Sequence, residues 1–171
     1  MSKQIEHIDC PKEWENTNDW DSHKEFLWLC LEKVKPNFTI ECGCGDGSTL
    51  LLDKYCKSFV SYETNKEWFN KILPSVPYSL LWVDDWGNLA TQECDLLFVD
   101  CAPGEIRKDI ILRFENEAQV IIAHDTEPGA EYVYGMSEVL NSFKYRLDYQ
   151  PKGKPHTTAV SNFINIEEWV K

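Results

Sequence analysis

Short apolar runs alternate with longer segments of helical periodicity along most of the chain. Near-continuous apolar runs bounded by turn residues are typical of parallel strands that are buried on both faces. The runs expected to form strands are 38–42, 58–63, 78–84, 95–100, 118–125, 144–150 and 157–165. The segments expected to form helices after the first strand are 48–57, 65–73, 105–117 and 130–142. The alternation predicts an α/β fold with a mostly parallel sheet and helices on both faces.

A further helix is expected before the first strand. Ser22 is followed three positions later by Glu25 and then by the apolar run FLWLCL. This spacing predicts a capping box, in which Ser22 caps the start of the helix. Pro36 ends the helix, because the residue before a proline is disfavoured in helical geometry.

Acidic residues recur at the ends of the predicted strands. In a parallel sheet the carboxyl ends of the strands meet at one edge, and ligands bind there, near the point where the strand order reverses. Buried strands gain nothing from terminal acids, so several acids along one edge indicate a polar site. The residues at these ends are Glu41, Glu63, Asp84, Asp100 and the pair His124 and Asp125.

Composition narrows the class of protein. The chain has 171 residues, of which 43% are hydrophobic and 13% aromatic, as expected for one globular domain spanning 1–171. Within it, residues 1–21 form an amino-terminal extension that could cover an acceptor site. The start is polar, without the apolar segment of a signal peptide, and the seven cysteines lack paired spacing. We therefore expect free thiols and a cytoplasmic protein.

The charge balance excludes some partners. Seventeen basic and 29 acidic residues give a net charge of −12. An acidic surface repels phosphate backbones and anionic lipid, so nucleic acid is an unlikely partner and membrane binding is not expected.

Three glycines follow the first predicted strand. Gly43, Gly45 and Gly47 would let a ligand approach the backbone closely, and the next helix would offer its free amides to an anionic group. A dinucleotide-binding loop requires G-x-G-x-x-G, and its third glycine would fall at Ser48. The sequence therefore does not fit an enzyme that binds a nicotinamide dinucleotide, and that interpretation also leaves Glu41 unexplained.

The stretch IECGCGDGST resembles motif I of the class I S-adenosylmethionine-dependent methyltransferases, and the layout of that family fits residues 22 to 166. The resemblance implies a Rossmann-like, seven-stranded, mostly parallel sheet whose last strand is antiparallel. It implies that Glu41 and the glycines hold the methionine part of S-adenosyl-L-methionine, that Glu63 binds the ribose hydroxyls, and that Asp84 or Asp85 meets the adenine. The implied cofactor-binding residues are Glu41, Gly43, Gly45, Gly47, Glu63, Asp84, Asp85, Trp86 and Asp100.

Two acidic stretches, DCAPGEIR and HDTE, are the candidates for the chemistry. Asp100 and Asp125 would end neighbouring strands, and hard oxygen ligands suit Mg²⁺. The arrangement resembles the metal site of magnesium-dependent O-methyltransferases, which implies Asp100 and Asp125, with Thr126 or His124, as ligands of Mg²⁺. A histidine follows the fourth-strand acid in the sugar-modifying members, and Cys101 stands in that place here.

The general base must therefore come from elsewhere. The catalytic residues expected on this basis are Asp100, His124, Asp125 and His156, with either histidine as the base. His23 could also reach the acceptor pocket, although a polar residue near a helix start needs no such role. Arg107 is expected to pair with Asp100 or Glu105.

The leading hypothesis is O-methylation of a hydroxyl on a sugar, glycan or other small molecule. One alternative is 2′-O-methylation of RNA, for which Lys24, Asp100, Lys144 and Glu167 would form a Lys-Asp-Lys-Glu set. Another is a catalytically silent module that binds S-adenosyl-L-methionine. With no inserted cap domain, the acceptor site must be built from the amino-terminal segment, the residues after 125 and the 151–157 loop, or from a second subunit of a homodimer.

Overall fold

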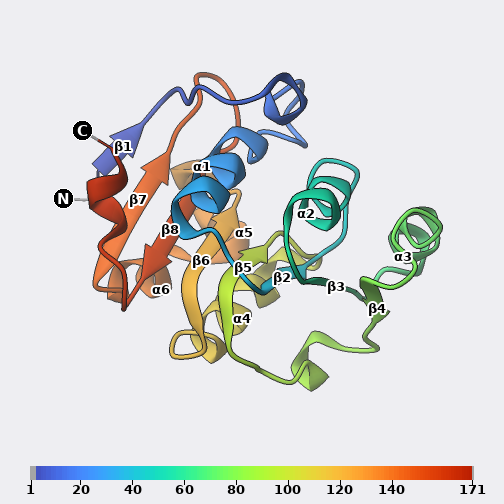
Figure 1. Cartoon of the computed structure of the whole chain (residues 1–171). Helices are drawn as coiled ribbons and strands as arrows, with labels where there is room; N and C mark the ends of the chain where they lie inside the picture. The colour runs from blue at the N-terminus through green and yellow to red at the C-terminus, as the bar shows by residue number, and fades with distance from the viewer. Residues whose placement is uncertain (1–2, 171) are drawn as a thin grey trace.

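The computed structural model describes residues 3–170, and its strands form a single sheet (Figure 1). The strand order is β1-β7-β8-β6-β5-β2-β3-β4. β8 runs antiparallel to both of its neighbours, and the other pairs are parallel. The fold expected from the sequence is confirmed. The strands are β1 (Lys3–Ile5), β2 (Thr39–Cys42), β3 (Phe59–Glu63), β4 (Leu80–Trp82), β5 (Cys94–Val99), β6 (Ala118–His124), β7 (Tyr145–Tyr149) and β8 (Thr157–Ser161).

Helices cover both faces of this sheet (Figure 1). The α-helices are α1 (Lys24–Val34), α2 (Thr49–Tyr55), α3 (Lys66–Ile72), α4 (Arg107–Arg113), α5 (Glu131–Tyr134) and α6 (Ser137–Ser142). Short 3-10 helices are η1 (Lys12–Trp14), η2 (Trp86–Asn88), η3 (Gly104–Ile106), η4 (Pro128–Ala130) and η5 (Ile166–Trp169). Within residues 3–170, no helix combines the length and the apolar character needed to cross a membrane.

The amino-terminal segment is part of the domain. β1 extends the sheet beyond the seven expected strands by pairing with β7, Gln4 opposite Asp148. The sequence KQI carries no apolar run, so its strand forms only because β7 offers an open edge. Trp14 is fully buried, which anchors the rest of the segment. Residues 1, 2 and 171, which belong to the predicted domain, lie outside the described part of the chain.

The predicted capping box is wrong. α1 begins after His23, whose side chain caps no amide, and Oδ1 of Asn16 accepts the Glu25 amide at 3.2 Å. The Ser22 hydroxyl instead hydrogen-bonds Nε2 of His124 at 2.8 Å, and both carboxylate oxygens of Glu25 bond to partners outside the helix. Ser22 therefore bonds to a residue distant in the sequence, His124, rather than to the amides at the start of its own helix. The predicted end of the helix before Pro36 is confirmed, since Lys35 takes a left-handed conformation there.

The core lies on both faces because β5 and β6 alternate their apolar side chains. Leu97 and Val99 face α4 and α6, whereas Leu96 and Phe98 face α1 and α2. All four are fully buried. Such strands carry no polar positions in their middles, so polar chemistry is restricted to their ends.

The strand order places a reversal at the centre of the sheet. From β2 the chain moves outward to β3 and β4, and it then returns to β5 on the other side of β2. The carboxyl ends of β2 and β5 therefore flank the point where ligands bind in folds of this kind. The glycine loop, residues 43–47, follows β2, and Asp100 follows β5.

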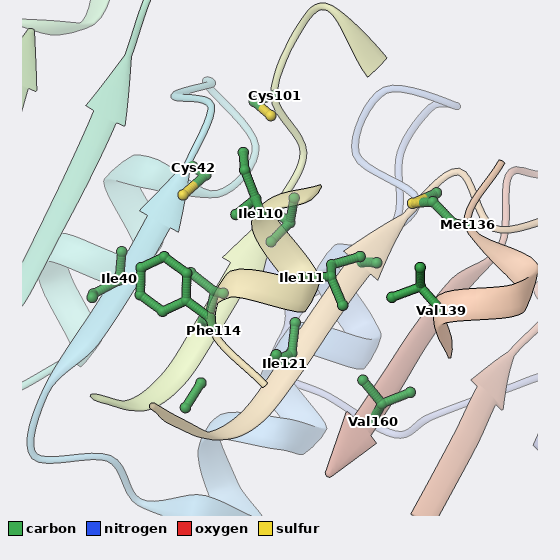
Figure 2. Close-up of a cluster of buried hydrophobic side chains, with 14 of the residues drawn as sticks. Ile40, Cys42, Cys101, Ile110, Ile111, Phe114, Ile121, Met136, Val139 and Val160 are labelled. Atoms are coloured by element: carbon green, nitrogen blue, oxygen red, sulfur yellow. The ribbon is translucent and has the colours of Figure 1, made fainter. Parts of the chain in front are cut away.

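We predict that Phe114→Ala lowers the free energy of unfolding by about 3–5 kcal/mol, because it opens a cavity under α4. Phe114 is 1% exposed and packs with Ile110 and Ile111 of α4 and with Ile40 and Ile121 of the sheet (Figure 2). Urea denaturation measures the change. Leu112→Ala on the same helix is the control, because Leu112 is 43% exposed, and equal losses for the two variants would contradict this packing.

Candidate active site

The glycine loop passes so close to the end of β5 that only glycine fits at its start. Gly43 has a φ of +97°, and a Cβ added there would lie 2.6 Å from the carbonyl oxygen of Asp100. A Cβ on Gly45 would meet nothing within 4 Å, which leaves open space beside the backbone. A Cβ on Gly47 would lie 3.1 Å from Cβ of Asp21, so the amino-terminal segment covers that end of the loop. All three predicted glycines therefore lie at the reversal.

Glu41 supports the loop from within. Its carboxylate is fully buried and accepts hydrogen bonds from the hydroxyls of Ser48, Thr49 at 2.7 Å and Ser61 at 2.6 Å. Burial raises the pKa of Glu41 to about 7, and the three hydroxyls offset part of that rise. Because the Glu41 carboxylate is 0% exposed, a cofactor could touch it directly only if the surrounding side chains moved. We infer that Glu41 acts by fixing the loop and the start of α2.

Glu63 joins the end of β3 to the same loop. One carboxylate oxygen accepts the Cys44 amide at 2.9 Å, and the other accepts the amides of Thr64 at 2.7 Å and Asn65 at 2.6 Å. A carboxylate offers about four acceptor positions, so about one remains for a ligand hydroxyl. Glu63 thus lies where the sequence places it, and its contact with a ribose stays a prediction.

The predicted adenine-binding group is only partly assembled. Asp84 accepts the indole N–H of Trp82 at 2.7 Å, and Asp85 caps η2 by accepting the Gly87 amide at 2.6 Å. Trp86 is 3% exposed, lies in the core, and donates its indole N–H to the Ala102 carbonyl at 2.9 Å. Packing of the Trp86 ring in the core argues against its predicted contact with the cofactor, which stays untested.

Arg107 lies between the two carboxylates that the sequence assigned to a metal ion. Its guanidinium contacts Asp100 Oδ1 and Asp125 Oδ2, both at 2.9 Å, and it also donates to the backbone carbonyls of Cys101 and His124. The predicted pairing of Arg107 with Asp100 is confirmed. Asp125 is held in a left-handed backbone conformation, with a φ of +57°.

The predicted Mg²⁺ site of Asp100, Asp125 and Thr126 does not fit this arrangement. An ion between the two carboxylates would have to displace a buried guanidinium that contacts both acids and two backbone carbonyls, which is costly. The Thr126 hydroxyl accepts a hydrogen bond from Thr158 at 2.9 Å, in a different direction. The sequence showed two converging acids but could not show that a helix beginning at Arg107 would neutralise them.

His124 is held on both sides of its ring. Nε2 lies 2.8 Å from the Ser22 hydroxyl, and Nδ1 lies 3.3 Å from Asp100 Oδ2 and 3.5 Å from Asp125 Oδ1. Burial lowers the pKa of His124, but the two carboxylates outweigh it and raise the pKa above its ordinary value. For Asp100 burial raises the pKa, and His124 and Arg107 bring it well below the usual range. The two carboxylates thus favour the protonated form of His124, and its role as base stays a prediction.

His156 lies outside this group. Its backbone bonds Glu127 and Thr126, and its side chain lines a polar cavity of about 450 Å³ beside β7 and α6. Thr126 lines the same cavity. The Lys-Asp-Lys-Glu set is not assembled either. Lys144 and Glu167 lie near the start of β7, at the opposite rim of the sheet from Asp100, so the RNA hypothesis loses its catalytic group.

His23 lies at the site, although its position near a helix start predicted only a minor role. It is 2% exposed, its ring centroid lies 4.9 Å from those of Phe98 and His124, and its Nδ1 lies 3.9 Å from Asp100 Oδ2. Burial, with His124 nearby, lowers its pKa to about 3. The available signal in the sequence was a histidine just after the amino-terminal extension, residues 1–21, which was expected to cover the acceptor site. We call His23, Asp100, Arg107, His124 and Asp125 the rim cluster.

Solved methyltransferase structures share this fold. The N-methyltransferase NodS from Bradyrhizobium japonicum WM9, in complex with S-adenosyl-L-homocysteine, gives a TM-score of 0.66 at 14% identity over 86% of this chain and 89% of that one. An O-methyltransferase from Bacillus cereus, also with S-adenosyl-L-homocysteine, gives 0.60 at 13% identity over 88% and 84%. The O-methyltransferase TomG from Streptomyces achromogenes, in complex with SAM and involved in tomaymycin synthesis, gives 0.56 at 14% identity over 90% and 91%.

No protein-family model and no curated protein matches the sequence. The structural matches establish that the chain has the fold of the class I S-adenosylmethionine-dependent methyltransferases. Since both N- and O-methyltransferases share it, the fold does not select the atom that is methylated.

We predict that the stability of Glu41→Gln relative to the wild type rises with pH. Glu41 has an ordinary pKa of 4.5 and a folded-state pKa of about 7. The stabilisation linked to its proton is complete below pH 4.5 and is lost as pH rises through 7. The variant lacks this loss, so the difference between the two proteins should change by on the order of 3 kcal/mol from pH 4.5 to 8. Urea denaturation across this range measures it, and a constant difference would show that Glu41 is not a buried neutral acid.

Proposed function

We propose that the protein is an S-adenosyl-L-methionine-dependent methyltransferase that methylates a hydroxyl group of a sugar or other small molecule. One observation carries the proposal: the glycine loop, Glu63 and Asp100 meet at the reversal between β2 and β5, beside open space at Gly45. Gly43 packs on the Asp100 backbone, and the Cys44 amide binds Glu63, so the three parts form one rim. The solved structures with S-adenosyl-L-homocysteine or SAM support the same cofactor here.

The loop and Glu63 would hold the cofactor. The open backbone at Gly45 accommodates the close approach of a ligand, and the remaining acceptor position of Glu63 suits a ribose hydroxyl. Asp84 and Asp85 are exposed on the segment after β4, where the adenine amine could reach them. The cofactor would supply an activated methyl group on a sulfonium.

Asp100 would orient the acceptor. Its side chain is 21% exposed, and Arg107 fixes Oδ1, so a hydroxyl can donate a hydrogen bond to the carboxylate from the open side. Methyl transfer is an in-line displacement, and its rate depends on holding the acceptor oxygen in line with the sulfur–methyl bond. The methyl group would pass to the hydroxyl oxygen, whose proton is lost to solvent, while the neutral thioether leaves.

A small acceptor suits the cover of this site. The Lys154 ammonium donates to the backbone carbonyls of Asn16 and Asn18, both at 3.3 Å. The segment before α1 and the 151–156 loop are therefore tied together within one chain. A site enclosed in this way favours a small molecule over a polymer, and the net charge of −12 also disfavours RNA.

We predict that Gly45→Ala weakens binding of S-adenosyl-L-homocysteine at least tenfold and leaves stability within about 0.5 kcal/mol. The added methyl group meets no protein atom and would occupy the space proposed for the cofactor. Isothermal titration calorimetry measures binding. Gly43→Ala is the contrasting variant, which should lose about 3 kcal/mol or more of stability because it combines a clash with a positive φ. No binding by the wild type would overturn the proposal.

We predict that Asp100→Asn lowers methyl transfer at least about 100-fold and still binds S-adenosyl-L-homocysteine. The measurement is transfer of labelled methyl from S-adenosyl-L-methionine to a panel of sugars and small hydroxyl compounds. Equal transfer by the variant and the wild type would exclude the role of Asp100. Cofactor binding without transfer to any member of a broad panel would favour the catalytically silent module.

A further inference from the structure

We propose that His23, Asp100 and His124 form a binding site for one divalent transition-metal ion. One ligand atom from each side chain lies within 4.8 Å of the other two. Nδ1 of His124 is 3.3 Å and Nδ1 of His23 is 3.9 Å from the same oxygen, Oδ2 of Asp100. Ligands that bind a common ion at about 2.1 Å lie about 3.0–3.4 Å apart, depending on the coordination geometry. Only small side-chain adjustments would therefore bring the three atoms onto one ion.

The buried His23 ring is the independent sign of a missing ligand. Among residues 3–170, neither Nδ1 nor Nε2 of His23 has a hydrogen-bond partner, although the residue is 2% exposed. Buried polar side chains in proteins are nearly always paired, because an unpaired one costs free energy. Nδ1 points to Asp100 Oδ2, so a cation at this position would give the unpaired nitrogen a bond.

The other two ligands are already oriented through their far atoms. Ser22 hydrogen-bonds Nε2 of His124 at 2.8 Å, which leaves Nδ1 for the ion. Arg107 holds Asp100 Oδ1 at 2.9 Å, which leaves Oδ2 for the ion. Metal-binding histidines and carboxylates are usually held by such partners, which fix the ring or the carboxylate in place. The partial exposure of Asp100 leaves a side of the site open to water or a ligand.

The donor set selects the kind of ion. Two imidazole nitrogens and one carboxylate suit Mn²⁺, Fe²⁺, Co²⁺ or Zn²⁺, whereas Mg²⁺ prefers oxygen ligands. The charge of Arg107 nearby limits affinity, but Asp125 offsets it at 2.9 Å. This site shares Asp100 with the one expected from the sequence, but it uses two histidines and a transition-metal ion in place of Mg²⁺. Asp125 is not a ligand, because it is paired with the guanidinium of Arg107.

Binding of the ion does not depend on the proposed function, but its use would. An ion held by Asp100 would act as a Lewis acid: it would lower the pKa of an acceptor hydroxyl bound to it and so help that hydroxyl to lose its proton to solvent when its oxygen takes the methyl group. The site would thereby supply what the rim cluster otherwise lacks, because His124 serves as a ligand of the ion and His156 lies elsewhere.

Titration with Co²⁺ alone tests the site, since its visible absorption distinguishes nitrogen and oxygen ligands from thiolates. We expect one equivalent to bind the wild type, with at least tenfold weaker binding by His23→Gln and by His124→Gln. His7→Gln is the matched control, because His7 is exposed and its ring contacts the exposed Asp9; it should bind as the wild type does. No binding at millimolar Co²⁺, thiolate bands, or equal affinity in His23→Gln would overturn the proposal.

Nitrogen-15 NMR of the imidazole rings in the wild type with Zn²⁺ covers the case in which a buried-histidine variant fails to fold. We expect the Nδ1 signals of His23 and His124 to move together to metal-bound positions, and unchanged signals would refute the site. Calorimetry with S-adenosyl-L-homocysteine separates the two proposals. If the protein binds the metal ion but not the cofactor, the proposed metal site stands and the proposed methyltransferase function is wrong.

Discussion

The close passage of Gly43 over the end of β5 is the constraint on which the rest of the site depends. The position has room for a hydrogen atom and not for a methyl group, because the Asp100 carbonyl lies in the way. This contact joins the loop after β2 to the strand on the far side of the reversal. Every other group at the rim, from the Cys44 amide on Glu63 to the carboxylate of Asp100, takes its place from that junction.

Charge is the second organising factor. Asp100 and Asp125 end neighbouring strands, and two carboxylates so close in a largely buried place need positive partners. Arg107 supplies one from the start of α4, and the His124 ring lies against both carboxylates on the other side. The pair that suggests a magnesium site in the sequence is thus neutralised by the protein itself. Beside the other oxygen of Asp100 lies the His23 ring, whose nitrogens have no hydrogen-bond partner within the described residues.

The segment before α1 links fold and site. Trp14 anchors it in the core, Asp21 covers Gly47, Ser22 holds His124, and His23 packs on Phe98. A stretch that looks like a simple helix start therefore supplies three consecutive residues to the rim. Lys154 ties the same segment to the loop between β7 and β8, so the cover belongs to the domain rather than to an added lid.

The sequence by itself determined that the fold is a mostly parallel sheet and that its polar site lies at the carboxyl ends of the strands. Apolar runs, three glycines and terminal acids are local signals, and each reports the backbone geometry or burial of its own segment. It could not determine which side chains meet there. Each of three outcomes depended on partners far apart in the chain. Ser22 binds His124 instead of capping a helix, Trp86 packs in the core, and Arg107 rather than an ion joins two acids. Only the tertiary structure decided those outcomes, because burial and charge neutralisation act between segments and leave no periodic trace within any one of them.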